Sequence, residues 1–215
     1  MYYCKGFTLK NFSTMNRYRF MIVIFFAVLI WSGINPHDYG VWFLEVVPGV
    51  IALLLFGLTY KKLRFTDMAY YVILIHCLIL FVGGHYTYAR VPVFDYIREF
   101  FDTGRNSYDK IGHLAQGFTP VLVAREFLIR RKIMANGPWS SVAAVSFAMA
   151  FSAFYEIIEW FVAISTTTVG DDFLGTQGYI WDTQADMFWA LIGGLAMVFI
   201  FKGMHDKAIV KIESN

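Results

Sequence analysis

Charged residues are scarce in this sequence. Only 16% of its 215 residues are Asp, Glu, Lys or Arg, whereas 58% are hydrophobic and 19% are aromatic. A soluble domain of this length needs more polar surface to cover its core, but helices in lipid expose apolar side chains on every side. The composition therefore excludes an ordinary soluble domain. It predicts an all-α, polytopic transmembrane bundle, with residues 1–215 as a single integral membrane domain.

Cysteine is nearly absent, and so are the short motifs of several enzyme classes. Two cysteines, Cys4 and Cys77, are too few for a disulfide framework or a CxxC metal site. The sequence has no G-x-S-x-G, H-E-x-x-H or P-loop motif, so no motif indicates a reaction type. The net charge of +2 is small and the basic residues form short clusters, which argues against nucleic acid and leaves the lipid bilayer as the expected partner.

Long apolar runs, in contrast, are plentiful. Six stretches approach the roughly 20 residues that a helix needs to cross a bilayer. They are Phe20 to Ile34, Val41 to Tyr60, Met68 to Ala89, Ile111 to Ile129, Trp139 to Ile164 and Asp182 to Phe201. Residues 35–40 are rich in turn formers, which predicts a tight hairpin between the first two stretches.

Lys and Arg are unevenly distributed among the connections. Thirteen lie on the side that holds both termini, and four lie on the other side, all in the connection after the third stretch. By the positive-inside rule both termini are cytoplasmic. Residues 94–102 of that connection mix aromatic residues with acids, a pattern typical of a helix that lies in the outer interface.

Ionisable residues are costly inside a membrane, and six of them fall at one depth on the last three stretches. They form three pairs, one on each stretch: Asp109 with His113, Glu156 with Glu159, and Asp182 with Asp186. The members of each pair are three or four residues apart and so share a helix face, and Gln116 continues the face of Asp109 and His113. Counting about 1.5 Å per residue from each predicted boundary places all six near the non-cytoplasmic end. We expect an upper layer and a lower layer, formed respectively by Asp109, Glu159 and Asp182 and by His113, Glu156 and Asp186.

Five carboxylates and one imidazole cannot all stay charged in a dry bundle, because desolvation and like charges both oppose ionisation. The candidates for compensation are a divalent metal ion, bound protons, a water-filled cavity, and the cations Lys110 and Arg105. An oxygen-rich site with a single histidine suits Mg²⁺, Mn²⁺ or Ca²⁺. The candidate metal ligands are Asp109, His113, Asp182 and Asp186.

Two questions stay open, one about the role of the polar residues and one about the connection that follows the fifth stretch. The polar residues are either a functional site or hydrogen-bonded struts that hold three helices together. Residues 165–181 form a glycine-rich connection with two acids and Gln177, which is either a lid over the site or a solvated turn. With a lid, Gln177 and Gln116 are the candidate substrate contacts.

Four segments carry a family resemblance: 108–113 (YDKIGH), 155–160 (YEIIEW), 175–178 (GTQG) and 181–186 (WDTQAD). They resemble the YjdF family of bacterial inner-membrane proteins over about half of the chain. More distantly the chain is similar to VanZ-like proteins, which have Glu-x-x-Gln and an Asn where this sequence has Glu-x-x-Glu and Asp186. The resemblance implies a multi-pass protein of the bacterial inner membrane and implies no substrate.

These observations support three hypotheses. The first is a membrane-embedded enzyme acting on a lipid or envelope precursor, with Glu156 or Glu159 as general base and His113 as proton shuttle or ligand. The second is a proton- or cation-coupled transporter, although a site near one face differs from the midplane site usual for transporters. The third is a non-catalytic envelope protein with a structural polar cluster.

The orientation is testable with reporter fusions. Because thirteen basic residues lie on the side of the termini, a carboxy-terminal alkaline phosphatase fusion should be inactive and a green fluorescent protein fusion should fluoresce. An active phosphatase fusion would reverse the topology and move the polar cluster to the cytoplasmic face.

Overall fold

The computed structural model describes the backbone of residues 9–102, 104–165 and 180–214, and the side chains from residue 16 onward in these ranges. All regular elements in the described ranges are helical. In chain order they are α1 (Leu9–Ser32), α2 (Tyr39–Thr59), α3 (Asp67–Tyr86), α4 (Pro92–Phe101), α5 (Tyr108–Arg130), α6 (Pro138–Ser165), α8 (Asp182–Ala196), the π-helical segment η1 (Met197–Phe201) and α9 (Lys202–Glu213).

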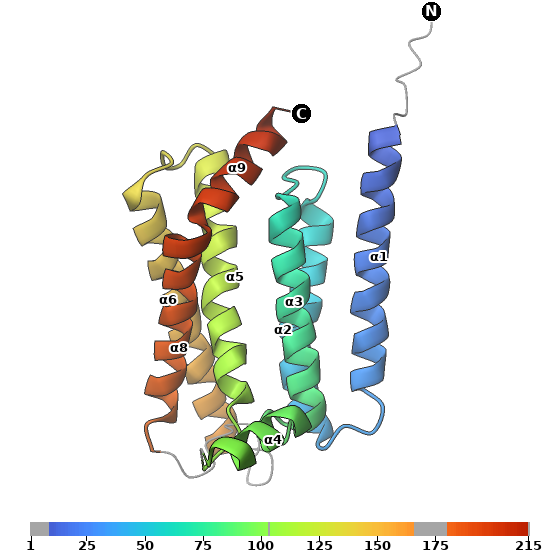
Figure 1. The fold of residues 1–215 in the computed structure, drawn as a ribbon, viewed down its shortest axis with the longest axis vertical. Coiled ribbons are helices and arrows are strands. Elements are labelled where there is room, and N and C mark those ends of the chain that lie inside the picture. Colours follow the sequence, from blue (N-terminus) through green and yellow to red (C-terminus); the bar gives the residue numbers. More distant parts are fainter. Residues whose placement is uncertain (1–8, 103, 166–179, 215) are drawn as a thin grey trace, which may run out of the picture.

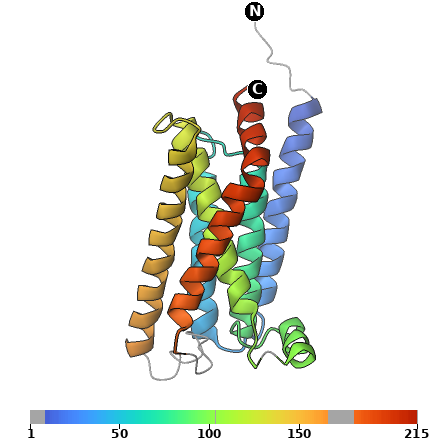
Figure 2. The same ribbon diagram turned by 60° about the vertical axis from the view of Figure 1, so that its left-hand side comes forward.

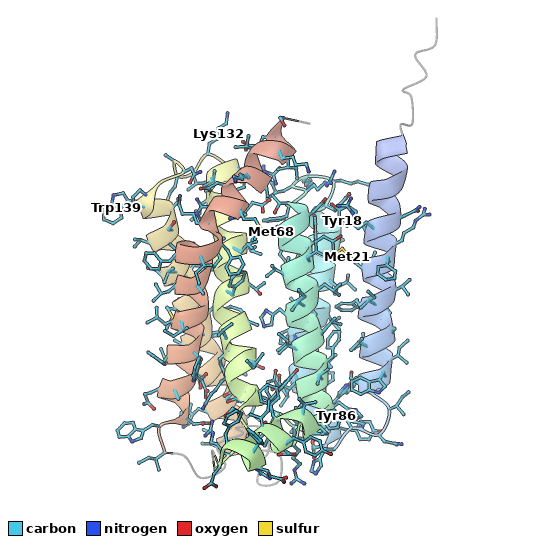
Figure 3. The ribbon with its side chains drawn as sticks, in the orientation of Figure 1. Tyr18, Met21, Met68, Tyr86, Lys132 and Trp139 are labelled. Atoms are coloured by element: carbon cyan, nitrogen blue, oxygen red, sulfur yellow. The ribbon has the colours of Figure 1, made fainter. Side chains whose placement is uncertain are left out.

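The long helices run side by side, and the short α4 lies across one end of the bundle (Figures 1 and 2). We call this end the α4 end. At the opposite end, the terminal end, α1 begins and α9 finishes (Figure 1). Lys132 and Trp139 lie at the terminal end and Tyr86 lies at the α4 end (Figure 3). Helix α1 therefore begins and α9 ends on one side of the bundle, as an even number of crossings between them requires.

Helix α5 is the centre of the bundle, because it packs against α3, α6 and α8. Helices α1 and α2 both pack against α3. The turn between α1 and α2 is short, as predicted, but α1 makes its main contacts with α3 instead of α2. The turn sets where α2 begins, whereas the apolar contacts of Phe25 with Phe81 draw α1 onto α3.

The helices have the lengths and surfaces that a bilayer requires. Four segments are long and apolar enough to cross a membrane: α2, α3, α6 and the continuous run Asp182–Glu213. Helices α1 and α5 run alongside them in Figure 1. Helix α5 carries the polar residues of the cluster and several basic residues, which lower its mean hydropathy. The all-helical membrane fold is confirmed, and the count of six crossings stays a prediction.

Local sequence signals explain where several helices begin. The side chain of Asp38 accepts a hydrogen bond from the backbone N–H of Val41, and that of Thr66 accepts one from Ala69. Helix α4 starts at Pro92, whose fixed φ suits a first helical turn. Its exposed Tyr96 and Phe100 give this helix the apolar face of an interfacial helix.

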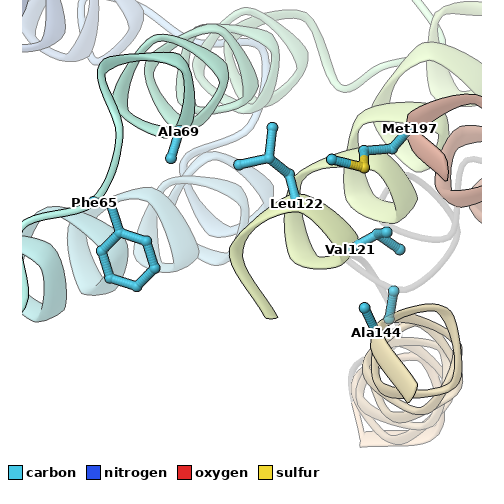
Figure 4. Packing of buried hydrophobic residues seen from close by; sticks show 7 residues of the cluster. Phe65, Ala69, Val121, Leu122, Ala144 and Met197 are labelled. Carbon is cyan, nitrogen blue, oxygen red and sulfur yellow. The ribbon is translucent and has the colours of Figure 1, made fainter. Parts of the chain in front are cut away.

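One apolar core joins the two halves of the bundle near the terminal end. Val121 and Leu122 of α5 contact Ala144 of α6, Met197 of η1 and the Phe65–Ala69 segment that starts α3 (Figure 4). Lipid tails are as apolar as these side chains, so the contacts stabilise the bundle through close packing and not through removal from water.

The closest approach is between α5 and α8. A Cβ atom on Gly117 would lie 1.7 Å from the carbonyl oxygen of Ala190, and one on Gly193 would lie 2.0 Å from that of Leu114. Two helix backbones therefore touch directly, as small residues allow in membrane proteins. Gly117 and Gly193 permit this approach because they carry no side chain.

This contact predicts a stability difference between two glycine substitutions. Gly117→Ala should lower the free energy of unfolding by about 1 to 3 kcal/mol, because the added methyl group forces the two backbones apart. Gly57→Ala is the matched control, since a Cβ there meets nothing within 4 Å and alanine favours the helix. Thermal unfolding in detergent compares them. Equal midpoints for the two variants would contradict the α5–α8 contact.

Candidate functional site

The predicted polar residues of α5 form a stripe that faces the interior of the bundle. Asp109, His113 and Gln116 are spaced at i, i+4 and i+7, so they lie one above another along the helix. His113 Nε2 lies 3.3 Å from Asp109 Oδ1, and His113 Nδ1 lies 2.7 Å from Gln116 Oε1. The side chain of His113 is only 7% exposed. The imidazole is therefore held at both nitrogens by its own helix.

Helices α6 and α8 bring further carboxylates to the same imidazole. Glu156 Oε1 lies 3.8 Å from His113 Nδ1, and Asp186 Oδ1 lies 3.7 Å from His113 Nε2. Glu159 and Asp182 are also buried, one turn nearer the α4 end. The structure thus brings together the polar residues that the sequence placed on three separate helices. The two layers merge, because Asp109 of the upper layer contacts His113 of the lower one.

Arg105 balances one of the acids. Its NH1 donates a hydrogen bond of 2.6 Å to Asp182 Oδ1, from the segment between α4 and α5. Asp182 therefore has a protein cation as a direct partner. Lys110, the other predicted cation, lies with Nζ 5.9 Å from the centre of the Trp189 ring. Of the two predicted cations, Arg105 makes a direct ion pair in the cluster.

Several oxygen atoms at the centre of the cluster have unused hydrogen-bonding capacity. Among the described residues, no hydrogen-bond donor reaches Asp109 Oδ2, Glu156 Oε1 or Asp186 Oδ1, and each of these atoms is buried. Buried polar atoms without a partner are rare in folded proteins and are costly. This pattern differs from that of structural struts, whose polar atoms satisfy one another.

A cavity of about 800 Å³ opens onto the cluster and extends along the bundle between α2, α3, α5 and α6. Asp109, His113 and Glu159 form part of its polar end, and Lys62 and Arg131 lie among the lining residues at the terminal end. Most of the wall between these ends consists of aliphatic and aromatic side chains, such as Ala52, Phe147 and Phe151. Glu156 and Asp186 are not among the lining residues and lie behind His113.

The structure adds residues that sequence reasoning weighed only lightly or missed. Glu45 of α2 is buried and lines the polar end of the cavity, together with Tyr88 and Tyr155. The ring of Tyr88 lies in a slot between α3 and α5, because Gly83 and Gly112 have no side chain to fill it. Tyr88 also has a positive φ of 48°, which no pattern in the sequence predicts. Gln177 and the rest of the predicted lid lie outside the described residues.

A second polar cluster, which we call the terminal-end network, has the hydrogen bonds and ion pairs expected of residues that hold helices together. Glu126 is fully buried and accepts hydrogen bonds from the backbone and hydroxyl of Thr66, both at 2.7 Å, and from Arg130 at 3.0 Å. Its second oxygen lies 3.2 Å from His205 Nε2. Arg125, also fully buried, donates to Asp206 and to Asn136. Arg125 and Glu126 therefore belong to one network of ion pairs and hydrogen bonds at the terminal end.

These two clusters should respond differently to loss of a charge. Glu126→Gln should lower the free energy of unfolding by about 3 to 5 kcal/mol, because it leaves the buried donors of Thr66 and the guanidinium of Arg130 without their carboxylate. Asp186→Asn should change it by less than about 1 kcal/mol, since no donor contacts Asp186 Oδ1 and a like-charge repulsion is relieved. Thermal unfolding in a chelating buffer measures both. A loss for Asp186→Asn as large as that for Glu126→Gln would mark the α4-end cluster as structural.

Comparison with known proteins places this fold and cluster in a family. The model described as "Predicted membrane protein (DUF2238)" matches residues 17–207, which include the described polar cluster. The inner membrane protein YjdF of Escherichia coli (strain K12) is 44% identical over 182 residues, which cover 85% of this chain and 87% of that protein. No solved structure matches the chain. The chain therefore belongs to the DUF2238 family of predicted membrane proteins and, as its likeness to YjdF shows, is an inner-membrane protein.

Proposed function

We propose that this protein is a membrane-embedded enzyme that acts on a lipid or a lipid-linked envelope precursor. The observation that carries the proposal is the cavity, whose long apolar wall ends at Asp109, His113 and Glu159. An acyl or prenyl chain fits the apolar wall, and the polar head group of the same molecule then lies at the cluster. A volume of about 800 Å³ is within the range of small-molecule sites.

The arrangement supports acid–base chemistry at the polar end. Glu159 faces the cavity and is the substrate-side general base, whereas Glu156 lies behind the imidazole, 3.8 Å from His113 Nδ1. His113 contacts carboxylates on both sides and also lines the cavity, so it serves as a proton shuttle while its Nε2 is free and as a ligand when a cation is bound there. Gln116 supports this role because its amide oxygen holds the imidazole ring in place.

The position of the site indicates from which leaflet of the membrane a substrate head group reaches it. With the termini cytoplasmic, the α4 end faces away from the cytoplasm, and the head group of an outer-leaflet lipid reaches the cluster. Helix α4 lies at this end of the bundle (Figure 2), and its exposed apolar side chains suit the membrane interface. The proposal therefore concerns lipids or envelope precursors of the outer leaflet of the inner membrane.

A proton- or cation-coupled transporter is the second candidate, and one observation favours it. The cavity lining extends from the cluster at the α4 end to Lys62 and Arg131 at the terminal end, and it includes His76 and Thr119 on the way. The wall is otherwise apolar, which suits a lipid chain better than a hydrated solute. We therefore place transport second.

Lipid binding and turnover test the proposal. Ala143→Trp fills the cavity, whereas Ala150→Trp on the same helix is exposed and lies outside the lining residues, so it is the matched control. Each variant is purified in mild detergent, and bound lipid is identified by mass spectrometry. The wild type and Ala150→Trp should carry the same lipid, and Ala143→Trp should carry at least about tenfold less.

Catalysis is measured by incubating the purified protein with a lipid extract of the inner membrane and following new lipid masses. The wild type should form a product, and Glu159→Gln should bind the lipid but form none. Equal lipid in Ala143→Trp and Ala150→Trp would contradict binding in the cavity. Proton or cation flux in proteoliposomes, lost in Glu159→Gln and without any lipid product, would favour the transporter.

A further inference from the structure

We propose that Asp109, His113 and Asp186 form a three-residue site for one divalent cation, of the Mn²⁺ or Mg²⁺ class, at the polar end of the cavity. This site goes beyond the proposed reaction and stands on geometry of its own. One ligand atom from each residue lies within 4.8 Å of the other two. His113 Nε2 is 3.3 Å from Asp109 Oδ1 and 3.7 Å from Asp186 Oδ1.

These distances suit three neighbouring positions of an octahedral site. With metal–ligand bonds of about 2.1 Å, adjacent ligand atoms are about 3.0 Å apart. The three protein atoms need to move by only a few tenths of an ångström to about one ångström to reach this geometry. The ligands come from α5 and α8, whose backbones touch at Gly117 and Gly193, so the pair of helices holds the set rigidly.

The contacts of His113 provide a second and independent observation. An amide oxygen only accepts hydrogen bonds, so the contact with Gln116 Oε1 at 2.7 Å places the proton on His113 Nδ1. In the neutral ring Nε2 then carries a lone pair and points it towards two carboxylates. A histidine whose other nitrogen donates to a fixed acceptor is the usual arrangement of a metal ligand.

Two oxygen atoms of the carboxylates around Nε2 are buried and lack hydrogen-bond partners among the described residues. Asp186 is 2% exposed, and its Oδ1 has no hydrogen-bond partner among the described residues. Asp109 Oδ2 is equally without one. Buried carboxylate oxygens that face a nitrogen lone pair need a positive charge beside them, and a cation bound by all three residues supplies it. Two carboxylates with one imidazole favour a hard cation over Zn²⁺ or Cu²⁺, which prefer more nitrogen or sulfur.

The neighbouring acids have other roles in this arrangement. Asp182, which the sequence suggested as a fourth ligand, pairs instead with Arg105 at 2.6 Å. Glu156 lies on the Nδ1 side of the ring and not on the Nε2 side. Because Asp109 and His113 line the cavity, the remaining coordination positions of the cation face it and are open to water or to an oxygen atom of a bound head group.

Manganese binding tests the site directly. The full-length protein is purified in detergent, stripped with a chelator and titrated with Mn²⁺ alone, while electron paramagnetic resonance reports free Mn²⁺. The wild type should bind one Mn²⁺ per chain. Asp186→Asn and His113→Gln should weaken binding at least tenfold, and Gln116→Leu should weaken it by about 10- to 100-fold through loss of the ring orientation. Gel filtration confirms that each variant is folded.

The matched control is Asp206→Asn, which removes a carboxylate from the terminal-end network and should leave Mn²⁺ binding unchanged. Ala143→Trp should also bind Mn²⁺ normally, so a failed lipid experiment and a failed metal experiment are distinguishable. Absence of binding by the wild type, or equal binding by Asp186→Asn, would overturn the site. A doubly protonated His113 in the wild type with saturating Mg²⁺ present, detected by nitrogen NMR, would overturn it as well.

Discussion

The contact on which the polar site depends is the direct approach of the α5 and α8 backbones at Gly117 and Ala190. The two helices run in the same direction, from the α4 end to the terminal end (Figure 1). Moving one turn towards the α4 end from Gly117 and from Ala190 reaches His113 and Asp186, which face each other at 3.7 Å. A methyl group at Gly117 would separate these side chains as well as the backbones. The glycine contact therefore fixes the register of the site.

The membrane fold and the meeting of the polar residues at one end of the bundle were predictable from the sequence, because both follow from counting residues; the depth of this end in a bilayer stays a prediction. Apolar runs give the helices, and a rise of about 1.5 Å per residue gives the level of each acid. The count cannot give the rotation of a helix or the partner of an individual side chain. Pairing of Asp182 with Arg105 depends on the path of the chain after α4, and the slot for Tyr88 depends on a positive φ beside two glycines. These features arise only from tertiary packing.

The two polar clusters show how the cost of a buried charge is met in different ways. In the terminal-end network, Glu126 and Arg125 have several donors or acceptors each, so the charges are neutralised within the protein. At the α4 end, Glu156 and Asp186 each keep an oxygen without a donor among the described residues. Evolution retains such unsatisfied groups mainly where they contact something besides the protein. This contrast is the strongest argument against a purely structural role for the α4-end cluster.

Charge also links the proposed cation to the proposed substrate. An anionic head group that enters the cavity faces Glu45, Asp109 and Glu159. At a separation of 4 Å, two unit charges repel by about 4 kcal/mol at an effective dielectric constant of 20, so two ionised acids are enough to exclude a phosphorylated lipid. A divalent cation on Asp109, His113 and Asp186 neutralises its two carboxylate ligands and presents open coordination positions to a phosphate oxygen. An anionic substrate therefore requires the cation, whereas a neutral or cationic head group binds without it.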